Sequence, residues 1–231
     1  MIRKAGFFLT FVLLAVTITS CAPTKIAKKD AFPEMYNERP LSVLVLPPIN
    51  ATTAADAKEY YSTTVAEPMS YAGYYILPIE VTGDILKSIG LPDTEMVNEV
   101  HLQKFKEFFG ADAVLFVKIV KWDTTYVVLA GNVAVGVQCV LKSTTTFKNL
   151  WQYDGVIVVD TSGGSGGGGG LIGLAVKAIL TAISTATTDY VPIARRVNSM
   201  VIGSMPYGKY HPGFDTDREV AILPRNVTTN K

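Results

Sequence analysis

The sequence predicts an α/β (α+β) domain in which flanking helices cover a mixed sheet. Short apolar runs without charge, typical of strands buried on both faces, alternate with helical patterns in the first half of the chain. Segments of alternating apolar and polar residues follow, and these are typical of antiparallel strands. The predicted order is therefore β-α-β-α-β, then an antiparallel meander, then two C-terminal helices. A chain that is 48% hydrophobic and only 18% charged is expected to fold.

The first part of the domain contains two predicted strands joined by a helix. Residues 41–46 are a short apolar run closed by two prolines, which favours a strand. Residues 54–72 carry apolar side chains at three-and-four spacing, which predicts a helix. We expect this helix to bend or restart at Pro68, because proline cannot donate the interior hydrogen bond. The second strand is predicted at 74–81, where Pro78 indicates a sheet edge or a bulge.

Two further helices lead to the third strand. Residues 82–89 predict a short helix, and a second helical stretch ends at Phe109. Gly110 follows it as a C-terminal cap. Residues 114–122 then predict a strand that is apolar on both faces until its lysines.

The texture of the sequence changes after residue 124. Residues 126–129 and 133–141 predict two antiparallel strands, and Gly131–Asn132 between them favours a hairpin turn, because both residues tolerate positive φ. Residues 150–159 predict a third strand, with a second turn around 149–151. These segments form the predicted meander.

The C-terminal part begins with a segment rich in glycine. Residues 161–170 contain seven glycines and predict a flexible loop, because glycine loses the most backbone freedom on ordering. Residues 171–188 predict a mostly apolar helix, and Asp189 is expected to start a second one. The tail, 207–231, is polar and rich in turns, and residues 220–223 are its one candidate strand.

The N-terminus has the pattern of a bacterial lipoprotein signal. Arg3 and Lys4 precede an apolar helix of secretory length that ends near Ser20 and Cys21. The small Ser20 permits cleavage, and a cysteine at the cleavage site can carry a diacylglyceryl group on its thiol and a further acyl chain on its freed amine. We therefore expect residues 1–20 to be removed and Cys21 to be lipidated. Two or three acyl chains make a stable membrane anchor.

A transmembrane helix is the alternative interpretation of this segment. A span needs about 20 apolar residues, and the apolar stretch here is shorter and ends in polar residues. Ala22 stands where an aspartate would retain a lipoprotein in the inner membrane, which favours the periplasmic face of the outer membrane. The predicted organisation is a signal peptide (1–20), a tether or linker (21–40), an α/β domain (41–206) and a polar tail (207–231).

Cysteine usage and charge limit the possible functions. Once Cys21 is acylated, Cys139 is the remaining thiol, so no internal disulfide is expected. Cys139 lies in 133–141, where every odd position is apolar, which predicts a buried core thiol rather than a nucleophile. The net charge of +1 becomes −1 when Arg3 and Lys4 are removed, and nothing in this balance indicates nucleic acid.

No motif predicts catalysis, a cofactor or a metal. The loop at 161–170 precedes a predicted helix, as phosphate-binding loops do, but it lacks the Lys-Ser or Lys-Thr that such loops require, so no nucleotide is expected. His101 and His211 lack the short-range partners of a metal site. No serine stands in a glycine-flanked elbow between a strand and a helix.

Two apolar segments are candidate contact surfaces. The helix predicted at 171–188 has a polar side, which favours docking on a sheet or on another subunit over crossing a membrane. The hairpin predicted at 126–141 is an alternative membrane-inserted segment, although one of its strands is too short. The candidate partner-contact residues of the helix are Leu171, Leu174, Ala175, Ala178, Ile179 and Ala182.

Three segments together carry a family resemblance. They are Val43-Leu-Val-Leu-Pro-Pro, Gly73-Tyr-Tyr-Ile-Leu-Pro, and Phe109-Gly-Ala-Asp-Ala-Val-Leu-Phe-Val-Lys-Ile before a meander with Leu150-Trp151. The chain resembles the periplasmic domain of the curli-secretion lipoprotein CsgG over about residues 40–205. It is more closely similar to a family of outer-membrane lipoproteins of unknown function that are often encoded beside CsgG homologues.

This resemblance implies a fold like the amino-terminal domain of TolB and an accessory or assembly role at the outer membrane, without catalytic residues. CsgG forms its pore with long amphipathic hairpins, and only the short segment around Gly131 corresponds to them here. The first hypothesis is thus a non-enzymatic, lipid-anchored periplasmic lipoprotein that contacts copies of itself or other envelope lipoproteins. The alternatives are an oligomeric outer-membrane channel component and, with no supporting motif, an envelope hydrolase.

Overall fold

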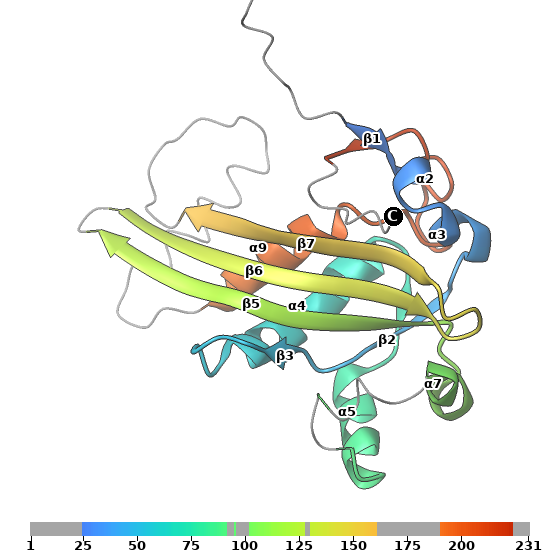
Figure 1. Ribbon diagram of the computed structural model, residues 1–231, viewed down its shortest axis with the longest axis horizontal. Helices are drawn as coiled ribbons and strands as arrows, with labels where there is room; N and C mark the ends of the chain where they lie inside the picture. The colour runs from blue at the N-terminus through green and yellow to red at the C-terminus, as the bar shows by residue number, and fades with distance from the viewer. Residues whose placement is uncertain (1–24, 92–94, 96–101, 128–129, 161–189, 224–231) are drawn as a thin grey trace, which may run out of the picture.

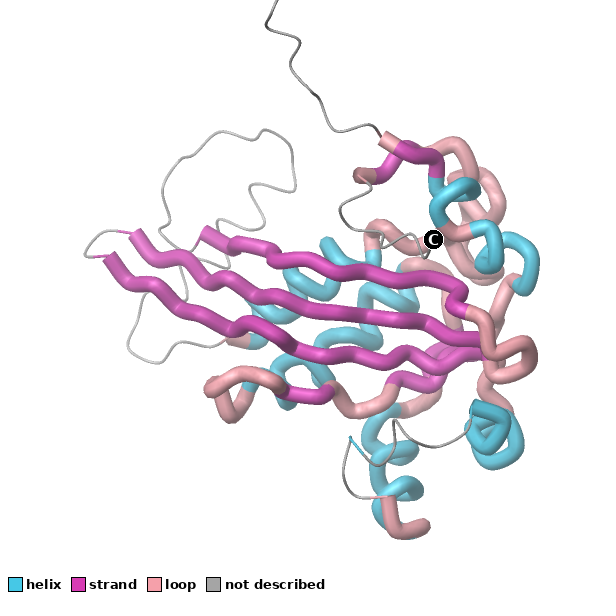
Figure 2. The backbone as a smooth tube through the Cα atoms, viewed as in Figure 1, coloured by secondary structure: helices cyan, strands magenta, loops and turns pink. Residues whose placement is uncertain are grey.

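The computed structural model describes residues 25–91, 95, 102–127, 130–160 and 190–223. Six strands of these residues form one mixed sheet in the order β4-β2-β5-β6-β7, with β3 also paired to β5 (Figures 1 and 2). The strands are β1 (Ile26–Ala27), β2 (Ser42–Val45), β3 (Ile49–Asn50), β4 (Tyr75–Ile76), β5 (Ala113–Val127), β6 (Ala130–Ser143), β7 (Asn149–Asp160) and β8 (Ala221–Ile222). The helices are α2 (Lys28–Ala31), α3 (Pro33–Glu38), α4 (Ala57–Tyr71), α5 (Ile79–Ser88), α7 (Leu102–Phe109) and α9 (Val191–Ile202).

The direction of the strands confirms the predicted fold class. β2 runs parallel to β4 and to β5, and β3 also runs parallel to β5. β5 and β6 are antiparallel, as are β6 and β7. Parallel neighbours need a long crossover, which α4 supplies between β2 and β4, whereas the meander needs only turns. β5 is therefore the strand at which the α/β half joins the antiparallel half.

Helices cover the two faces of the sheet unequally. α4 and α9 pack together on one face, and the main core lies between them and the sheet (Figure 1). On β6 the odd positions from Val133 to Leu141 all face this core, as the alternation predicted. α5 and α7 contribute Leu86 and Phe105 to a second cluster on the other face, over the β2 end.

The helix α4 forms where it was predicted, with two local differences. It runs unbroken through Pro68, which is buried three residues before the helix ends. The chain then leaves the helix through Gly73, whose φ of 90° is the left-handed conformation that glycine adopts without strain. The predicted strand 74–81 shrinks to β4, because α5 begins directly after Pro78. Proline has no N–H to donate and a fixed φ, so it suits a helix start as well as a strand edge.

The hairpin turn was predicted in the wrong place. Gly131 pairs with Tyr126, and Asn132 pairs with Thr125, so both lie within β6. The chain reverses at residues 128–129, which lie outside the described residues.

A bulge explains why β5 looked like two strands. The pairing with β6 shifts between Ile119 and Lys121, so the extra residue, Val120, changes the phase of the alternation. Ile119 and Trp122 consequently both face the core, although three positions separate them. The next turn occupies 144–148, just before β7, and not 149–151.

Most of the segment predicted as a linker, 21–40, is folded. The linker assignment is therefore wrong for residues 25–40. β1 pairs with β8, and α2 and α3 follow it directly. Phe32, Met35 and Tyr36 of this segment are all buried. Their three-and-four spacing is helical, but it is too short to stand out among lysines and prolines. The tail also packs against the body, and β8 lies within the strand candidate 220–223.

Several predicted elements lie outside the described residues. They are the glycine-rich loop (161–170), the apolar helix (171–188) and the helix start at Asp189. α9 is the second predicted C-terminal helix, and Pro192 stands in its first turn. No helix within the described ranges is long and apolar enough to span a membrane.

Candidate functional site

The predicted site residues are not placed by the structure. Ser20 and Cys21 lie outside the described residues, as does the contact helix with Leu171, Leu174, Ala175, Ala178, Ile179 and Ala182. The described residue nearest to Cys21 in the chain is Lys25. The surroundings of Lys25 and the exposed faces of the domain are therefore the parts of the structure that bear on function.

A buried ion pair joins the two ends of the domain next to Lys25. The Nζ atom of Lys28 in α2 lies 3.1 Å from Oδ2 of Asp217 and donates a second hydrogen bond of 2.7 Å to the carbonyl of Met205. Asp217 also accepts hydrogen bonds from the Tyr36 hydroxyl, at 3.1 Å, and from the Tyr207 backbone N–H, at 3.0 Å. We call Lys28, Tyr36, Tyr207 and Asp217 the terminal clamp.

The terminal clamp is almost fully withdrawn from water. The side chains of Lys28 and Asp217 are 4% and 1% exposed. Buried charges are tolerated only when they are paired and hydrogen-bonded, and both conditions hold here. Burial raises the pKa of Tyr36 well above its ordinary value, and the Asp217 carboxylate adds to this effect. Tyr36 therefore stays protonated and acts as a hydrogen-bond donor.

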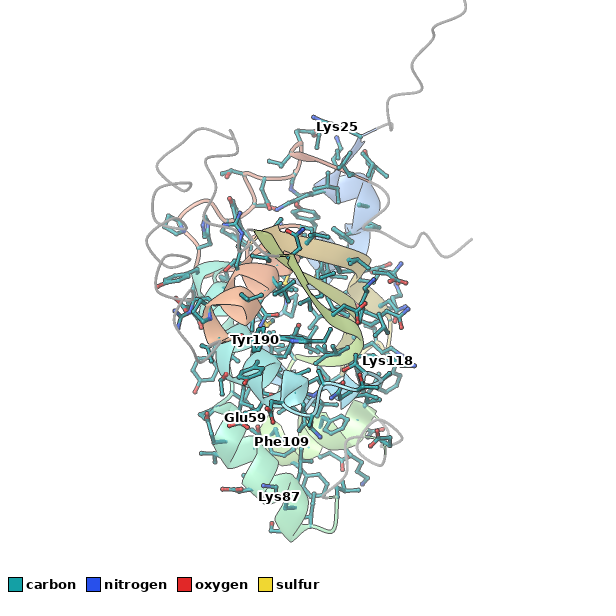
Figure 3. All side chains as sticks on the ribbon, turned by 90° about the vertical axis from the view of Figure 1, so that its left-hand side faces the viewer. Lys25, Glu59, Lys87, Phe109, Lys118 and Tyr190 are labelled. Atoms are coloured by element: carbon teal, nitrogen blue, oxygen red, sulfur yellow. The ribbon has the colours of Figure 1, made fainter. Side chains whose placement is uncertain are left out.

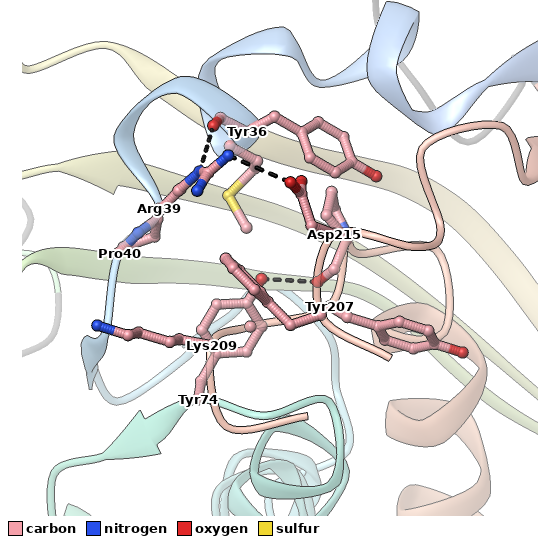
Figure 4. A pocket seen from close by; sticks show the side chains of 11 residues that line it. Tyr36, Arg39, Pro40, Tyr74, Tyr207, Lys209 and Asp215 are labelled. Carbon is pink, nitrogen blue, oxygen red and sulfur yellow. Dashed lines mark hydrogen bonds and ion pairs between the residues drawn. The ribbon is translucent and has the colours of Figure 1, made fainter. Parts of the chain in front are cut away.

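A second set of charges lies beside Tyr36 of the clamp, around the hollow drawn in Figure 4. Arg39 donates to Oδ2 of Asp215 at 3.2 Å and to the Tyr36 carbonyl at 3.1 Å. Arg218 pairs with Asp215 at 2.7 Å and lies over the ring of Tyr36. The hollow that these residues line measures only about 10 Å³, which is room for one water molecule. It is a structural joint rather than a ligand pocket.

A close backbone crossing ties the same C-terminal segment to the end of α4. Gly208 donates to the Ala72 carbonyl at 2.7 Å, and Tyr210 donates to the Gly73 carbonyl at 3.1 Å. A Cβ atom on Gly73 would lie 2.3 Å from the His211 backbone nitrogen, and one on Gly208 would lie 2.4 Å from the Gly73 carbonyl oxygen. Only glycine fits at either position.

The side of β5, β6 and β7 that faces away from α4 and α9 forms a second feature, which we call the open face. Lys118 projects from this side of the sheet in Figure 3. Three valines on it are well exposed: Val120 at 37%, Val156 at 55% and Val158 at 62%. The described residues at the centre of the open face are Lys118, Val120, Lys121, Asp123, Ala134, Gly136, Gln138, Asp154, Val156 and Val158.

The open face has an apolar row and flanking charges. Gly136 pairs with Val156 on one side and with Lys121, beside the bulged Val120, on the other. A Cβ atom on Gly136 would lie 2.9 Å from Cβ of Lys121 and 3.2 Å from Cγ2 of Val120 and of Val156, so the two valines flank this glycine on either side. Single exposed valines are ordinary, whereas a contiguous row on a sheet face is typical of a contact surface.

An aromatic hollow lies on the opposite side of the molecule from the open face. Tyr60, Trp122 and Tyr190 pack their rings at centroid distances of 5.8 to 6.3 Å. With residues 53–57 they line a hollow of about 290 Å³, near the lower limit for small-molecule sites. Sequence reasoning missed it, because the three rings come from distant elements.

The remaining titratable groups have structural roles. Cys139 is buried, as predicted, and burial raises the pKa of its thiol to about 12, so it carries no reactive thiolate. Its sulfur lies 3.6 Å from the Tyr61 hydroxyl. His211 stacks on Tyr207 and accepts a hydrogen bond from Gly213 in the predicted turn. His101 lies outside the described residues, within which no group of three metal-ligating side chains occurs.

The hairpin predicted as an alternative membrane segment is committed to the core over most of its length. Val133, Val135 and Val137 of β6 are all buried beneath α4 and α9. Insertion of 126–141 into a bilayer would expose this side. The structure therefore weighs against the channel hypothesis for this segment.

The fold and the paired chain ends define a mixed α/β domain, and sequence comparison assigns it to a family. The model of the family described as "Putative lipoprotein GNA1162-like" matches residues 31–208, so this chain belongs to that family. A curated relative, "Putative lipoprotein NMB1124/NMB1162" of Neisseria meningitidis serogroup B, is 28% identical over 77% of this chain and 81% of its own length.

One solved structure agrees with this assignment. The crystal structure of lipoprotein GNA1162 from Neisseria meningitidis is similar with a TM-score of 0.50 and 28% identity, over 64% of this chain and all of that one. The PelC dodecamer from Paraburkholderia phytofirmans reaches a TM-score of 0.40 at 16% identity, over 70% of this chain and 88% of that one, which is too distant to inform on assembly. The finer relationship to CsgG stays a prediction.

Proposed function

We propose that this protein is a lipid-anchored envelope lipoprotein that acts without catalysis, by contacting other proteins and copies of itself, as an accessory or assembly factor. Cys21 carries the anchor, at the periplasmic face of the outer membrane. Membership of a lipoprotein family supports the anchor, and the signal pattern around Ser20 and Cys21 supports its position. A CsgG-like secretion or envelope system is the expected setting.

The observation that carries this proposal is the short distance between Cys21 and the folded body. β1 begins at Ile26, five residues after Cys21. Five extended residues span at most about 17 Å, at roughly 3.4 Å each. The domain is thus held against the bilayer and does not sway on a long tether. The terminal clamp makes this attachment rigid, because Lys28 is fixed to Asp217.

The attachment also orients the domain. Lys25 and Lys87 lie at opposite ends of the molecule (Figure 3), so an anchor next to Lys25 leaves the tip of α5, with Lys87, farthest from the membrane. The open face then lies on the flank of the anchored domain, where neighbouring proteins in the same membrane meet it. Contact between proteins is the activity that this arrangement favours.

Replacement of Cys21 by serine tests the anchor. We expect the wild-type protein to be recovered from the outer-membrane fraction with a mass that includes acyl chains on Cys21, and Cys21→Ser to appear in the soluble periplasmic fraction. A Cys139→Ser variant is the matched control, since the buried thiol has no part in anchoring. An unmodified Cys21 in protein from native cells, or a retained leader, would overturn the proposal.

Crosslinking in intact cells tests the mode of action. We expect a crosslinker to capture other envelope proteins or further copies of this chain with the wild type, and to capture them less with Cys21→Ser. If an activity assay on purified protein revealed turnover of an envelope polymer, the non-enzymatic part of the proposal would fail while the anchor stood.

A further inference from the structure

We propose that the open face of β5, β6 and β7 docks a second copy of this chain, with the two copies related by a two-fold axis along the line from Lys25 to Lys87. The proposal deepens the proposed function and rests on it, because anchoring sets the direction of the axis.

The membrane limits how two anchored copies can face each other. Both lipid anchors enter the same leaflet, so a two-fold axis must run along the membrane normal. In Figure 3 that direction is the line from Lys25 to Lys87, which is vertical there and in Figure 1, and Figure 1 shows β5, β6 and β7 running across it. When two open faces meet about such an axis, each strand lies opposite the same strand of the other copy. The two facing strands then run in opposite directions.

The apolar row supplies the centre of the contact. Val120, Gly136 and Val156 cross the three strands side by side. Gly136 has no side chain in the middle of the row, and the side chains of Val120, Lys121 and Val156 fill the space beside it, so the two valines are what the row presents to the second copy. An axis that passes through this row sets Val156 against the same residue of the second copy.

Two of the three charged side chains of the open face on β5, Lys118 and Asp123, are complementary about this axis, whereas Lys121 stands in the row that the axis crosses. Lys118 lies on one side of the apolar row and Asp123 on the other. Reversal of the strand brings Lys118 of one copy against Asp123 of the second, twice in the dimer. Asp123 contacts Lys121 at 3.2 Å within its own chain. Lys118 has no anionic partner among the described side chains, so the second copy would supply one.

An axis along the strands is the competing arrangement. It would set Lys118 against Asp154, whose carboxylate accepts a hydrogen bond from Gln138 at 3.1 Å. It would also place the two Lys25 ends on opposite sides of the dimer, so that both anchors could not enter one leaflet. The two arrangements therefore predict different crosslinks.

The size of the open face indicates a weak dimer. Three strands about 4.8 Å apart and four rows of side chains measure roughly 15 Å by 25 Å, on the order of 400 Å² per copy. A standard interface buries about 800 Å² per partner. Confinement of both copies to one membrane raises their effective concentration and compensates for this. In solution we expect the dimer only at high protein concentration.

A disulfide across the axis tests the geometry. The lipid-free chain with Cys21→Ser and Val156→Cys, at several hundred micromolar, is expected to form a covalent dimer on mild oxidation. Lys87→Cys in the same background is the control at the far end of the domain and is expected to stay monomeric. No covalent dimer with Val156→Cys, or an equal yield with Lys87→Cys, overturns the proposal. A crosslink that forms faster between a Val120→Cys chain and a Val156→Cys chain than between two Val156→Cys chains would indicate the axis along the strands. That result would also overturn the proposal.

A charge swap tests the pairing. Lys118→Asp and Asp123→Lys are each expected to weaken dimerisation at least about tenfold in sedimentation equilibrium, because like charges then meet. The double variant is expected to recover most of the wild-type affinity. Weakening by both singles without recovery in the double, or no effect of either, counts against the pairing. These measurements use the lipid-free chain, so a failed anchor leaves them intact, whereas a monomeric wild type at these concentrations refutes the interface alone.

Discussion

The Nζ atom of Lys28 lies 3.1 Å from Oδ2 of Asp217, so a buried ion pair joins two residues that are 189 positions apart. One partner stands seven residues after Cys21, and the other stands near the end of the described chain. Force transmitted through the proposed anchor on Cys21 would reach the body of the domain through β1 and this pair. The stability of the pair therefore decides whether the domain stays docked on its N-terminal segment.

Removal of either charge should destabilise the protein, and the two removals should differ. Asp217→Ala leaves the Lys28 ammonium buried and deprives Tyr36 and the Tyr207 N–H of their acceptor, so we expect a loss of about 3–5 kcal/mol. Lys28→Met leaves a carboxylate that still accepts two hydrogen bonds, so the loss should be smaller. Urea denaturation measures both.

The exposed pair of Lys104 and Glu107 provides the control for this comparison. These side chains are 54% and 45% exposed, so Glu107→Gln should change the free energy of unfolding by less than about 1 kcal/mol. An Asp217→Ala variant as stable as Glu107→Gln would contradict a structural role for the terminal clamp.

Truncation tests whether residues 25–40 are part of the domain. A chain that begins at Lys25 should fold normally, whereas one that begins at Leu41 loses the burial of Phe32, Met35 and Tyr36. Each such side chain contributes about 1.5–3 kcal/mol, so their sum approaches the whole stability of a typical domain. We expect the shorter chain to be insoluble or to melt at least about 10 °C lower. Equal melting temperatures would restore the linker interpretation.

The acid sensitivity of the domain should depend on Asp112. Burial alone would raise the pKa of this carboxyl, but the ion pair with Lys106 at 2.6 Å and the backbone N–H groups of Ser42 and Leu41 outweigh it, so the pKa is lowered. A lowered pKa stabilises the fold above the unfolded pKa, near 3.8, and this stability is lost as the pH falls through the folded value.

Asp112→Asn is therefore expected to cost about 1–2 kcal/mol at pH 7 and progressively less toward pH 3. Urea denaturation across this range measures the difference from the wild type. Asp154→Asn, on the exposed sheet face, is a control that should change little. A difference that stays constant down to pH 3 would show that the Asp112 charge is not involved.

The thiol of Cys139 should be inert in the folded protein. Its pKa is raised to about 12 by burial, while the unfolded thiol ionises near 9.0. Unfolding therefore releases a proton between these values, and this group makes the fold less stable as the pH rises above about 9. In a Cys21→Ser background, a thiol reagent at pH 8 should modify Cys139 only after addition of denaturant. Rapid modification of native protein would contradict the observed burial.

Local patterns predicted the core of the fold well. The alternation at 133–141 placed Cys139 and its odd-numbered neighbours on the buried face, because a strand with period two has a single way to bury one side. The apolar run at 41–46 became β2 for a different reason, because this strand is buried on both faces of the sheet. These signals depend on neighbouring residues, which a single sequence displays directly.

Features that depend on distant residues could not be predicted in this way. In the sequence Lys28 is one of several lysines in a predicted linker, and only the structure places Asp217 next to it. The bulge at Val120 likewise becomes apparent only from the pairing of β5 with β6. Gly131 is compatible with a turn and with a strand, and its pairing with Tyr126 places it in a strand. The open face was likewise invisible, because its row of Val120, Gly136 and Val156 comes from three strands.

The crossing of Gly73 and Gly208 gives a final prediction, in which two positive-φ glycines should respond differently. Gly73 has a φ of 90°, and a Cβ atom there would lie 2.3 Å from the His211 nitrogen. Gly90 has a φ of 84°, and a Cβ atom there meets nothing within 4 Å. Both alanine variants pay the strain of the left-handed conformation, about 1 kcal/mol.

Gly73→Ala must also push the segment around His211 away from α4, which breaks the hydrogen bonds from Gly208 to Ala72 and from Tyr210 to Gly73. We expect its free energy of unfolding to fall by at least about 3 kcal/mol, against about 1 kcal/mol for Gly90→Ala. Urea denaturation compares the two, and amide exchange should show loss of protection at Tyr210 in Gly73→Ala alone. Equal losses would mean that backbone strain, and not the crossing, makes glycine necessary at position 73.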